Sequence, residues 1–173
     1  MKPFTNAIQE QIIEYKKSRL DISDLIKNVD ISGQDLSNTI ISRLDISDQD
    51  IKETNFANAI LGTKDTIINV NRSTLDGSCL AGITCTGNVW ARRTSFKNCN
   101  FKRAFVPYID FRYADFRGAS FCETIFTIGT EKAVGAIFDK DFFRDLAGKW
   151  GIVVLYESEY QELIKKGELN EHK

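Results

Sequence analysis

Residue types that commonly carry out acid–base, nucleophilic or metal chemistry are sparse in this chain. The sole histidine is His172, so one copy of the chain can form neither a histidine-based catalytic triad nor a multi-histidine metal site. The chain has no G-x-S-x-G motif, no P-loop and no C-x-x-C pair. We therefore expect no catalytic residues, no cofactor and no bound metal. The alternative is a zinc site built from four dispersed thiols, Cys79, Cys85, Cys99 and Cys122.

Charged side chains nearly balance overall but are unevenly distributed along the chain. The chain has 23 Lys+Arg and 24 Asp+Glu, which gives a net charge of -1 and no general reason to expect nucleic acid as a partner. Residues 20–66 include four basic and nine acidic residues, whereas residues 67–122 include eight and three. The basic residues of the second segment are either a surface for an acidic partner or merely solvated outer positions. This candidate interaction surface consists of Arg92, Lys97, Lys102, Arg103, Arg112 and Arg117.

The elements that position these residues follow from a repeat of large apolar residues at every fifth position. Neither an α-helix nor a simple strand has this period. Between the two main runs the pattern continues through Val70, Leu75, Leu80, Cys85 and Trp90, with phase slips near residues 63–67 and 88–93. The two runs are Ile31, Leu36, Ile41, Ile46, Ile51, Phe56 and Leu61, and Phe96, Phe101, Val106, Phe111, Phe116, Phe121 and Phe126.

A short strand followed by a corner explains a period of five. The central apolar residue, position i, and residue i−2 face the interior, whereas residue i−1 faces solvent. This pattern predicts that Asp110 and Asp115 face solvent, that Cys85 and Cys99 are buried, and that the chain bulges to accommodate Trp90. Positions i+1 and i+2 turn the chain, and glycine, which tolerates a positive φ, occupies i+2 at Gly33, Gly77, Gly82, Gly87 and Gly118.

These units resemble the pentapeptide repeat family, whose unit is A-(D/N)-L-x-x. The best matches are QDLSN at 34–38, TNFAN at 54–58 and ADFRG at 114–118. The resemblance implies an all-β fold, a right-handed quadrilateral β-helix solenoid over residues 20–128, in which four repeats make one coil. About five coils would stack ~4.8 Å apart. The resemblance also implies that Phe96 stacks on Phe116 and Phe101 on Phe121.

Both ends of the solenoid are expected to carry helical caps within a single domain over residues 1–173. Residues 1–19 predict an N-terminal capping helix at 5–17, with Thr5 as its N-cap. Residues 129–173 leave the pattern and predict an α-helical C-terminal cap, with helices from residue 139 and at 157–166 around a short strand at 152–156. This segment has more apolar surface than one cap requires, so we expect a homodimer through it.

Two pairs of outward positions are apolar, which gives the leading hypothesis on function. Ile40 and Ile60 are twenty residues apart, as are Phe105 and Ile125. Exposed apolar patches of this kind contact a partner, the chain's own caps or a second copy. We therefore expect a non-enzymatic solenoid that presents flat faces for protein–protein interaction with an unidentified protein partner.

The alternative function is DNA mimicry. Some members of the resembled family bind DNA gyrase, a type II topoisomerase, and confer quinolone resistance; they are strongly acidic dimers. The mixed charge of this chain disfavours that alternative. The chain has neither a targeting segment nor an apolar stretch of membrane-spanning length, so we expect a cytoplasmic protein with reduced thiols and no membrane contact.

Overall fold

The structure is a computed structural model that describes residues 1–106, 108–126 and 132–139. The chain divides into two compact units, Met1–Phe138 and Asp139–Lys173, and Asp139 is the one described residue of the second unit. The helices and the strand expected at the C-terminal end therefore lie outside the described residues. The extent of a single domain, the C-terminal cap and the number of coils stay predictions.

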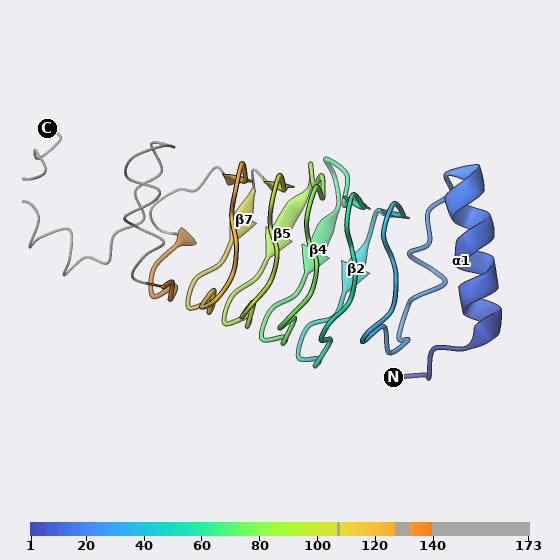
Figure 1. Cartoon of the computed structure of the whole chain (residues 1–173), viewed down its shortest axis with the longest axis horizontal. Coiled ribbons are helices and arrows are strands. Elements are labelled where there is room, and N and C mark those ends of the chain that lie inside the picture. Colours follow the sequence, from blue (N-terminus) through green and yellow to red (C-terminus); the bar gives the residue numbers. More distant parts are fainter. Residues whose placement is uncertain (107, 127–131, 140–173) are drawn as a thin grey trace, which may run out of the picture. The chain divides into compact units, whose positions relative to one another are not determined.

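The first unit begins with a helix, α1 (Asn6–Ser18), which confirms the helix expected near the N-terminus. Thr5 is its N-cap, as expected, and its side-chain oxygen accepts a hydrogen bond from an amide of the first turn. Ile12 is fully buried. Lys16 reaches Asp35 in the coils, with 3.4 Å between Nζ and Oδ2. The helix thus lies against the first end of the stack of coils (Figure 1).

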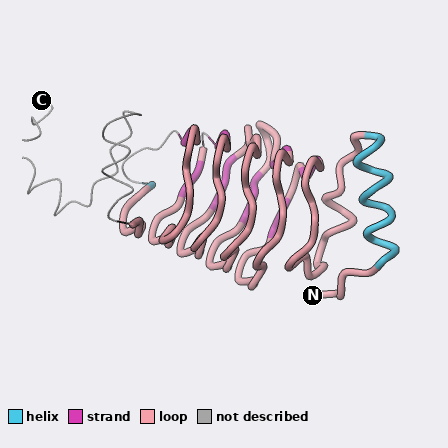
Figure 2. Tube along the Cα trace, in the orientation of Figure 1, coloured by secondary structure: helices cyan, strands magenta, loops and turns pink. Residues whose placement is uncertain are grey.

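Each coil consists of short extended segments joined by corners, and its strands are two or three residues long. All strand pairs are parallel, because one chain winds repeatedly in the same direction: β1 pairs with β3, β6 with β8, and β2, β4, β5 and β7 form one sheet in that order. Figure 2 shows the strands as short segments within winding loops. The strands are β1 (Ile40–Ile41), β2 (Leu44–Asp45), β3 (Ile60–Leu61), β4 (Ile67–Asn69), β5 (Asn88–Trp90), β6 (Phe105–Val106), β7 (Ile109–Asp110) and β8 (Ile125–Phe126).

Parallel pairing places each outward residue beside the outward residue of the next coil, so the outward residues form columns along the stack. Bridges between coils define four such columns, one on each side, and the fold is therefore a β-helix with four sides. The apolar column contains Ile40, Ile60, Thr84, Phe105 and Ile125, and begins with Asp21; the tryptophan column contains Asp45, Asn69, Trp90 and Asp110; the serine column contains Asp50, Thr74, Ser95, Asp115 and Ile137; and the amide column contains Asp35, Asn55, Cys79, Asn100 and Ser120.

Inward residues stack from coil to coil in the same way. Phe96 stacks on Phe116 with ring centroids 5.0 Å apart, and Phe101 stacks on Phe121 with centroids 5.3 Å apart. Both pairs confirm the stacking implied by the family resemblance. The rings within one coil meet edge to face, so aromatic contacts fill the interior at this end of the unit.

The five-residue arrangement continues beyond residue 128, where the sequence pattern was expected to end. Ile137 pairs in parallel with Asp115, and the ring of Phe138 stacks on that of Phe116 at 4.9 Å. Asp115 and Ile137 are 22 residues apart, whereas four repeats of five residues give 20. Because of this offset, stepping through the sequence five residues at a time does not detect the last unit.

Hydroxyl side chains that point into the interior bond to the preceding coil. The Oγ1 atom of Thr94 donates to the carbonyl of Val70 at 2.5 Å. Among the described residues, no buried side-chain nitrogen or oxygen lacks a hydrogen-bond partner. Polar atoms in the interior are therefore satisfied by the backbone. The same type of bond is made by Thr54, Ser73 and Thr124.

Insertions between repeats leave the columns in register. Ile60 pairs with Thr84, an offset of 24 residues where four repeats of five give 20. The extra residues form a loop at 62–66, closed by a hydrogen bond from the amide of Thr63 to Oγ1 of Thr66. The first phase slip expected from the sequence is therefore a four-residue insertion.

Gly87 marks the second phase slip, where the loop at 62–66 approaches the next coil closely. A Cβ atom on Gly87 would lie 2.4 Å from the carbonyl oxygen of Thr63 and 2.6 Å from that of Thr66. Only glycine permits this approach of two backbones. Its φ is not in the left-handed region, unlike those of the other four glycines expected at i+2.

The slip at Gly87 also places Trp90 on the outside, so the inward position that the period of five predicts for Trp90 is wrong. The indole side chain is 43% exposed, and its neighbours Val89 and Ala91 are the buried residues of this repeat. One extra residue before β5 shifts the phase earlier than the sequence pattern suggested. No bulge is needed to accommodate the indole.

The aromatic stack predicts a large difference between an inward and an outward substitution in adjacent repeats. Phe116 is 1% exposed, and Ser120 is exposed. Phe116→Ala should lower the free energy of unfolding by about 3–5 kcal/mol through lost burial and a cavity, whereas Ser120→Ala should change it by less than about 0.5 kcal/mol. Urea denaturation followed by circular dichroism measures both. Similar losses in the two variants would contradict the inward register.

The thiols predict an equally clear difference in reactivity. Burial raises the pKa of Cys85 to about 11 and that of Cys99 to about 12, whereas Cys122 is exposed. A thiol reagent at pH 8 should modify Cys122 rapidly, and Cys85 and Cys99 only after denaturant is added. Mass spectrometry of peptides after timed labelling identifies the modified positions. Rapid modification of Cys99 in the native protein would contradict its place in the interior.

Candidate functional site

The apolar column unites the two apolar pairs that the sequence predicts separately. Ile40 pairs with Ile60, and Phe105 pairs with Ile125. Thr84 lies between the two pairs and bridges Ile60 on one side and Phe105 on the other. The four-residue insertion conceals this continuity in the sequence, because Thr84 lies 24 residues after Ile60 rather than 20.

The six candidate basic residues, in contrast, do not form one surface. Arg92 and Arg112 lie at the corner that follows the tryptophan column, where the amide of Arg93 bonds to the carbonyl of Arg112. Residues 97 and 117 share the corner that follows the serine column, and residues 102 and 103 lie at the corner after the amide column. The six residues therefore lie at three different edges of the β-helix, and their contact with an acidic partner stays a prediction.

Most of these basic residues form ion pairs with carboxylates of the coils. Asp110 is only 7% exposed, so the expectation that it faces solvent is wrong. Arg92 Nε lies 2.8 Å and Arg112 Nη2 lies 2.7 Å from its Oδ2 atom. Burial alone would raise the pKa of Asp110, but the hydrogen bonds from Arg112 and Arg92 outweigh it and lower the pKa to about 2.

Asp115 binds a second pair of the candidate residues at the next corner. Arg117 Nη2 lies 2.6 Å from its Oδ2 atom, and Lys97 Nζ lies 3.6 Å from the same atom. Arg103 pairs with Glu123 at 2.7 Å. The hydrogen bonds from Arg117 lower the pKa of Asp115. These basic residues thus stabilise the stack locally, which weakens their role as a free basic surface.

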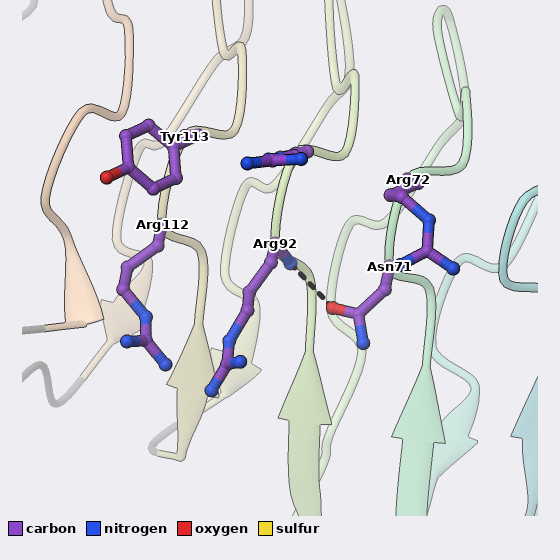
Figure 3. A pocket seen from close by; sticks show the side chains of 6 residues that line it. Asn71, Arg72, Arg92, Arg112 and Tyr113 are labelled. Atoms are coloured by element: carbon purple, nitrogen blue, oxygen red, sulfur yellow. Dashed lines mark hydrogen bonds between the residues drawn. The ribbon is translucent and has the colours of Figure 1, made fainter.

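The structure reveals one further cluster that the sequence reasoning missed. A hollow of about 300 Å³ lies along the corner that follows the tryptophan column, and we call it the arginine corner (Figure 3). It unites Arg92 and Arg112 with residues of the same corner in adjacent coils. All of the lining residues occupy positions i+1 or i+2 of the repeats in the tryptophan column. The sequence would have predicted this cluster if both phase slips had been placed correctly. The lining residues are Asn71, Arg72, Arg92, Arg93, Arg112 and Tyr113.

The fold and the repeat define the class of protein, a β-helix of five-residue units. A family model described as "Pentapeptide repeats" matches residues 92–127 with 8 copies of the repeat. Residues 92–127 therefore carry pentapeptide repeats, and the coils on both sides of the matched segment continue the same parallel pairing. A search among curated proteins gives no match.

Solved structures that are similar to the chain include a pentapeptide-repeat protein and a fluoroquinolone resistance protein. Rfr23 from the cyanobacterium Cyanothece 51142 is 19% identical with a TM-score of 0.23, over 53% of this chain and 61% of that chain. This chain thus spans less than two thirds of Rfr23. A trypsin-treated variant of QnrB1, described as a plasmid-mediated fluoroquinolone resistance protein, is 16% identical with a TM-score of 0.27, over 74% of this chain and 87% of that chain.

The described part of the chain also bears on membrane-spanning and metal-binding sites. No helix there has both the length and the apolar character that crossing a membrane requires. Within the same residues, no group of three or more His, Cys, Asp or Glu side chains is arranged to hold a metal ion.

The enclosed carboxylate predicts a specific pH dependence. Because the pKa of Asp110 is lower in the folded protein than in the unfolded chain, its contribution to stability is fully present above about pH 4 and is lost as the pH falls toward 2. Asp110→Asn should therefore destabilise the protein at pH 7, and the difference from the unmodified protein should shrink between pH 4 and pH 2. Urea denaturation at each pH measures this. A difference that is independent of pH would contradict the ion-pair arrangement.

Proposed function

We propose that the protein is a non-enzymatic β-helix whose apolar column docks a protein partner. The observation that carries this proposal is the exposure of large apolar side chains in one column: Ile60 is 46% exposed and Phe105 is 38% exposed. Thr84, whose side chain includes a methyl group, lies between them. Contiguous apolar surface on a folded domain marks contact with another molecule.

The amide and serine columns support this reading, because most of their residues at the same outward position are polar; Ile137 in the serine column and Trp90 in the tryptophan column are exceptions. Asn55 and Asn100 occupy it in the amide column, and Ser95 occupies it in the serine column. The backbone arrangement is the same, so folding itself does not require apolar side chains at Ile60 and Phe105. A role in docking therefore explains these side chains better than a role in folding does.

The shape of the column favours a protein partner over a small molecule. The hollow at the arginine corner follows the tryptophan column, which lies on a different side from the apolar column. This hollow therefore provides no pocket for a small molecule at the apolar column. Side chains on paired coils form a rigid strip, so a partner with a complementary apolar surface binds with little reorganisation of this chain. Repeat solenoids commonly present extended surfaces of this kind.

DNA mimicry as the alternative needs a continuous acidic surface, and the distribution of charge weighs against it. In the tryptophan column, Asp45 and Asp110 are separated by Asn69 and Trp90. Asp110 is also neutralised by two arginines. We therefore expect that the protein does not relieve quinolone inhibition in a gyrase supercoiling assay, and relief of inhibition would favour the alternative.

The docking proposal predicts that polar residues in the apolar column abolish partner binding without unfolding the protein. The double variant Ile60→Asn with Phe105→Asn introduces asparagine at two outward positions of the apolar column. The amide column already has asparagine at the same outward position. The amount of cross-linked partner recovered from cells should fall at least about tenfold, because the buried apolar area is lost. The control, Asn55→Ser combined with Asn100→Ser, should retain the partner. Equal recovery with folded variants, as judged by circular dichroism, would refute the proposal.

A homodimer through the C-terminal segment is part of the same proposal. The segment holds aromatic residues in excess of what one cap requires, and Phe138 already stacks on the last described coil. Deletion of residues 151–173 should therefore produce a monomer or an aggregate, whereas deletion of residues 1–5 should leave the dimer intact. Light scattering at tens of micromolar measures the mass. A full-length protein that is monomeric at this concentration would contradict the dimer and leave the docking face unaffected.

A further inference from the structure

Four arginines line the arginine corner. Arg72 forms a two-point ion pair with Asp48, with Nε and Nη2 each 2.5 Å from a carboxylate oxygen. Arg92 and Arg112 share the single carboxylate of Asp110. These three arginines are therefore ion-paired within the corner, and Arg93 is the fourth arginine that lines the hollow (Figure 3).

Arg93 differs from these three arginines in its contacts. Within the described part of the chain it has no carboxylate partner, and its guanidinium lies 5.8 Å from the centre of the Tyr113 ring. This cation–π contact orients the guanidinium without neutralising it. Tyr113 itself is 56% exposed, so the pair lies open to a ligand.

The free hydrogen-bonding groups of the hollow include several donors. The Oδ1 atom of Asn71 accepts a hydrogen bond from the amide of Arg92 at 2.8 Å, and this contact orients the side-chain amide. The Nδ2 group of Asn71 has no acceptor among the described residues. Guanidinium groups add further donors and no acceptors. A hollow rich in donors and positive charge is complementary to an anion with several oxygen atoms.

The backbone of this corner adopts the left-handed conformation that recurs at the corners of the coils. Arg72, Arg93 and Tyr113 all have φ between 56° and 61°, in the left-handed region that large side chains adopt at a cost of about 1 kcal/mol or more. Other corners meet the same requirement with glycine, with asparagine and also with charged residues, such as Glu53 after the serine column and Arg103 after the amide column.

The extent of the hollow limits the length of the ligand. Its lining residues come from three successive coils, which span about 10 Å at the spacing of paired strands. Toward the N-terminal end the same corner continues with Asp48, and the neighbouring column continues with Asp45. These carboxylates would repel a long polyanion that extended along the corner.

We propose that the arginine corner is a binding site for a short phosphate-bearing anion of the size of a diphosphate group. Arg93 and the amide of Asn71 bind the phosphate oxygens, and the ion-paired Arg72 and Arg92 flank them. The site is independent of the proposed docking face, because the apolar column contributes none of its lining residues.

Isothermal titration calorimetry of the full chain with inorganic pyrophosphate tests this site. Arg93→Gln should weaken binding at least about tenfold, because charge-assisted hydrogen bonds are lost. Arg103→Gln is the matched control: Arg103 also has a left-handed φ, of 60°, but it lies at another corner and pairs with Glu123. This control should bind pyrophosphate as the unmodified protein does.

Two further ligands identify the source of the phosphate groups. Equal affinities for pyrophosphate and ADP would assign the site to phosphate groups alone, and tighter binding of ADP would assign it to a nucleotide. Three results would overturn the proposal: no saturable binding of pyrophosphate at millimolar concentration, equal weakening by Arg93→Gln and Arg103→Gln, or preferred binding of a single-stranded oligonucleotide of about twenty nucleotides, which would indicate a nucleic-acid surface.

Discussion

The parallel hydrogen bonds between successive coils are the interaction on which the rest of the structure depends. Each coil satisfies its backbone groups through the next, so every outward residue lies beside an outward residue and every inward residue lies on an inward one. A substitution in one repeat therefore acts on a column and not on a single position. This constraint explains the stack of phenylalanine rings, the inward hydroxyl groups that bond to the preceding coil, and the columns that give each side of the β-helix its own chemistry.

The columns also explain how one fold carries two different kinds of surface. The proposed docking face depends on apolar residues at position i−1 of one side, where the backbone accepts either polar or apolar residues. The arginine corner depends on positions i+1 and i+2 of another edge, where the left-handed conformation limits the choice of residue. Because these positions are separate in every repeat, sequence changes can alter one surface without disturbing the other or the interior. Asp110 pairs with Arg92 and Arg112 of the arginine corner, Asp115 pairs with Lys97 and Arg117 of another corner, and these ion pairs connect adjacent coils.

The period of five was sufficient to predict the inward phenylalanines, the buried thiols and the apolar pairs, and the N-cap Thr5 with the residues that follow predicted the N-terminal helix. The period could not assign residues after an insertion to the correct inward or outward position. A loop shifts the register between coils, although large apolar residues continue to recur at about every fifth position. Trp90 was therefore assigned inward, Thr84 was not connected to the apolar pairs, and the unit that ends at Phe138 was missed. Asp110 shows a different limit: its position is outward as predicted, but its burial depends on Arg92 and Arg112, whose side-chain directions no sequence period specifies.

The central claim is that the loop at 62–66 is excluded from the coil, so that Ile60, Thr84 and Phe105 form one continuous column. The structure places the amide of Leu61 2.8 Å from the carbonyl oxygen of Thr84. Nuclear magnetic resonance can detect this bond directly, as a scalar coupling between the amide nitrogen of Leu61 and the carbonyl carbon of its acceptor. The account predicts a coupling to Thr84. A coupling to Leu80, the acceptor that a uniform offset between coils would select, would contradict it.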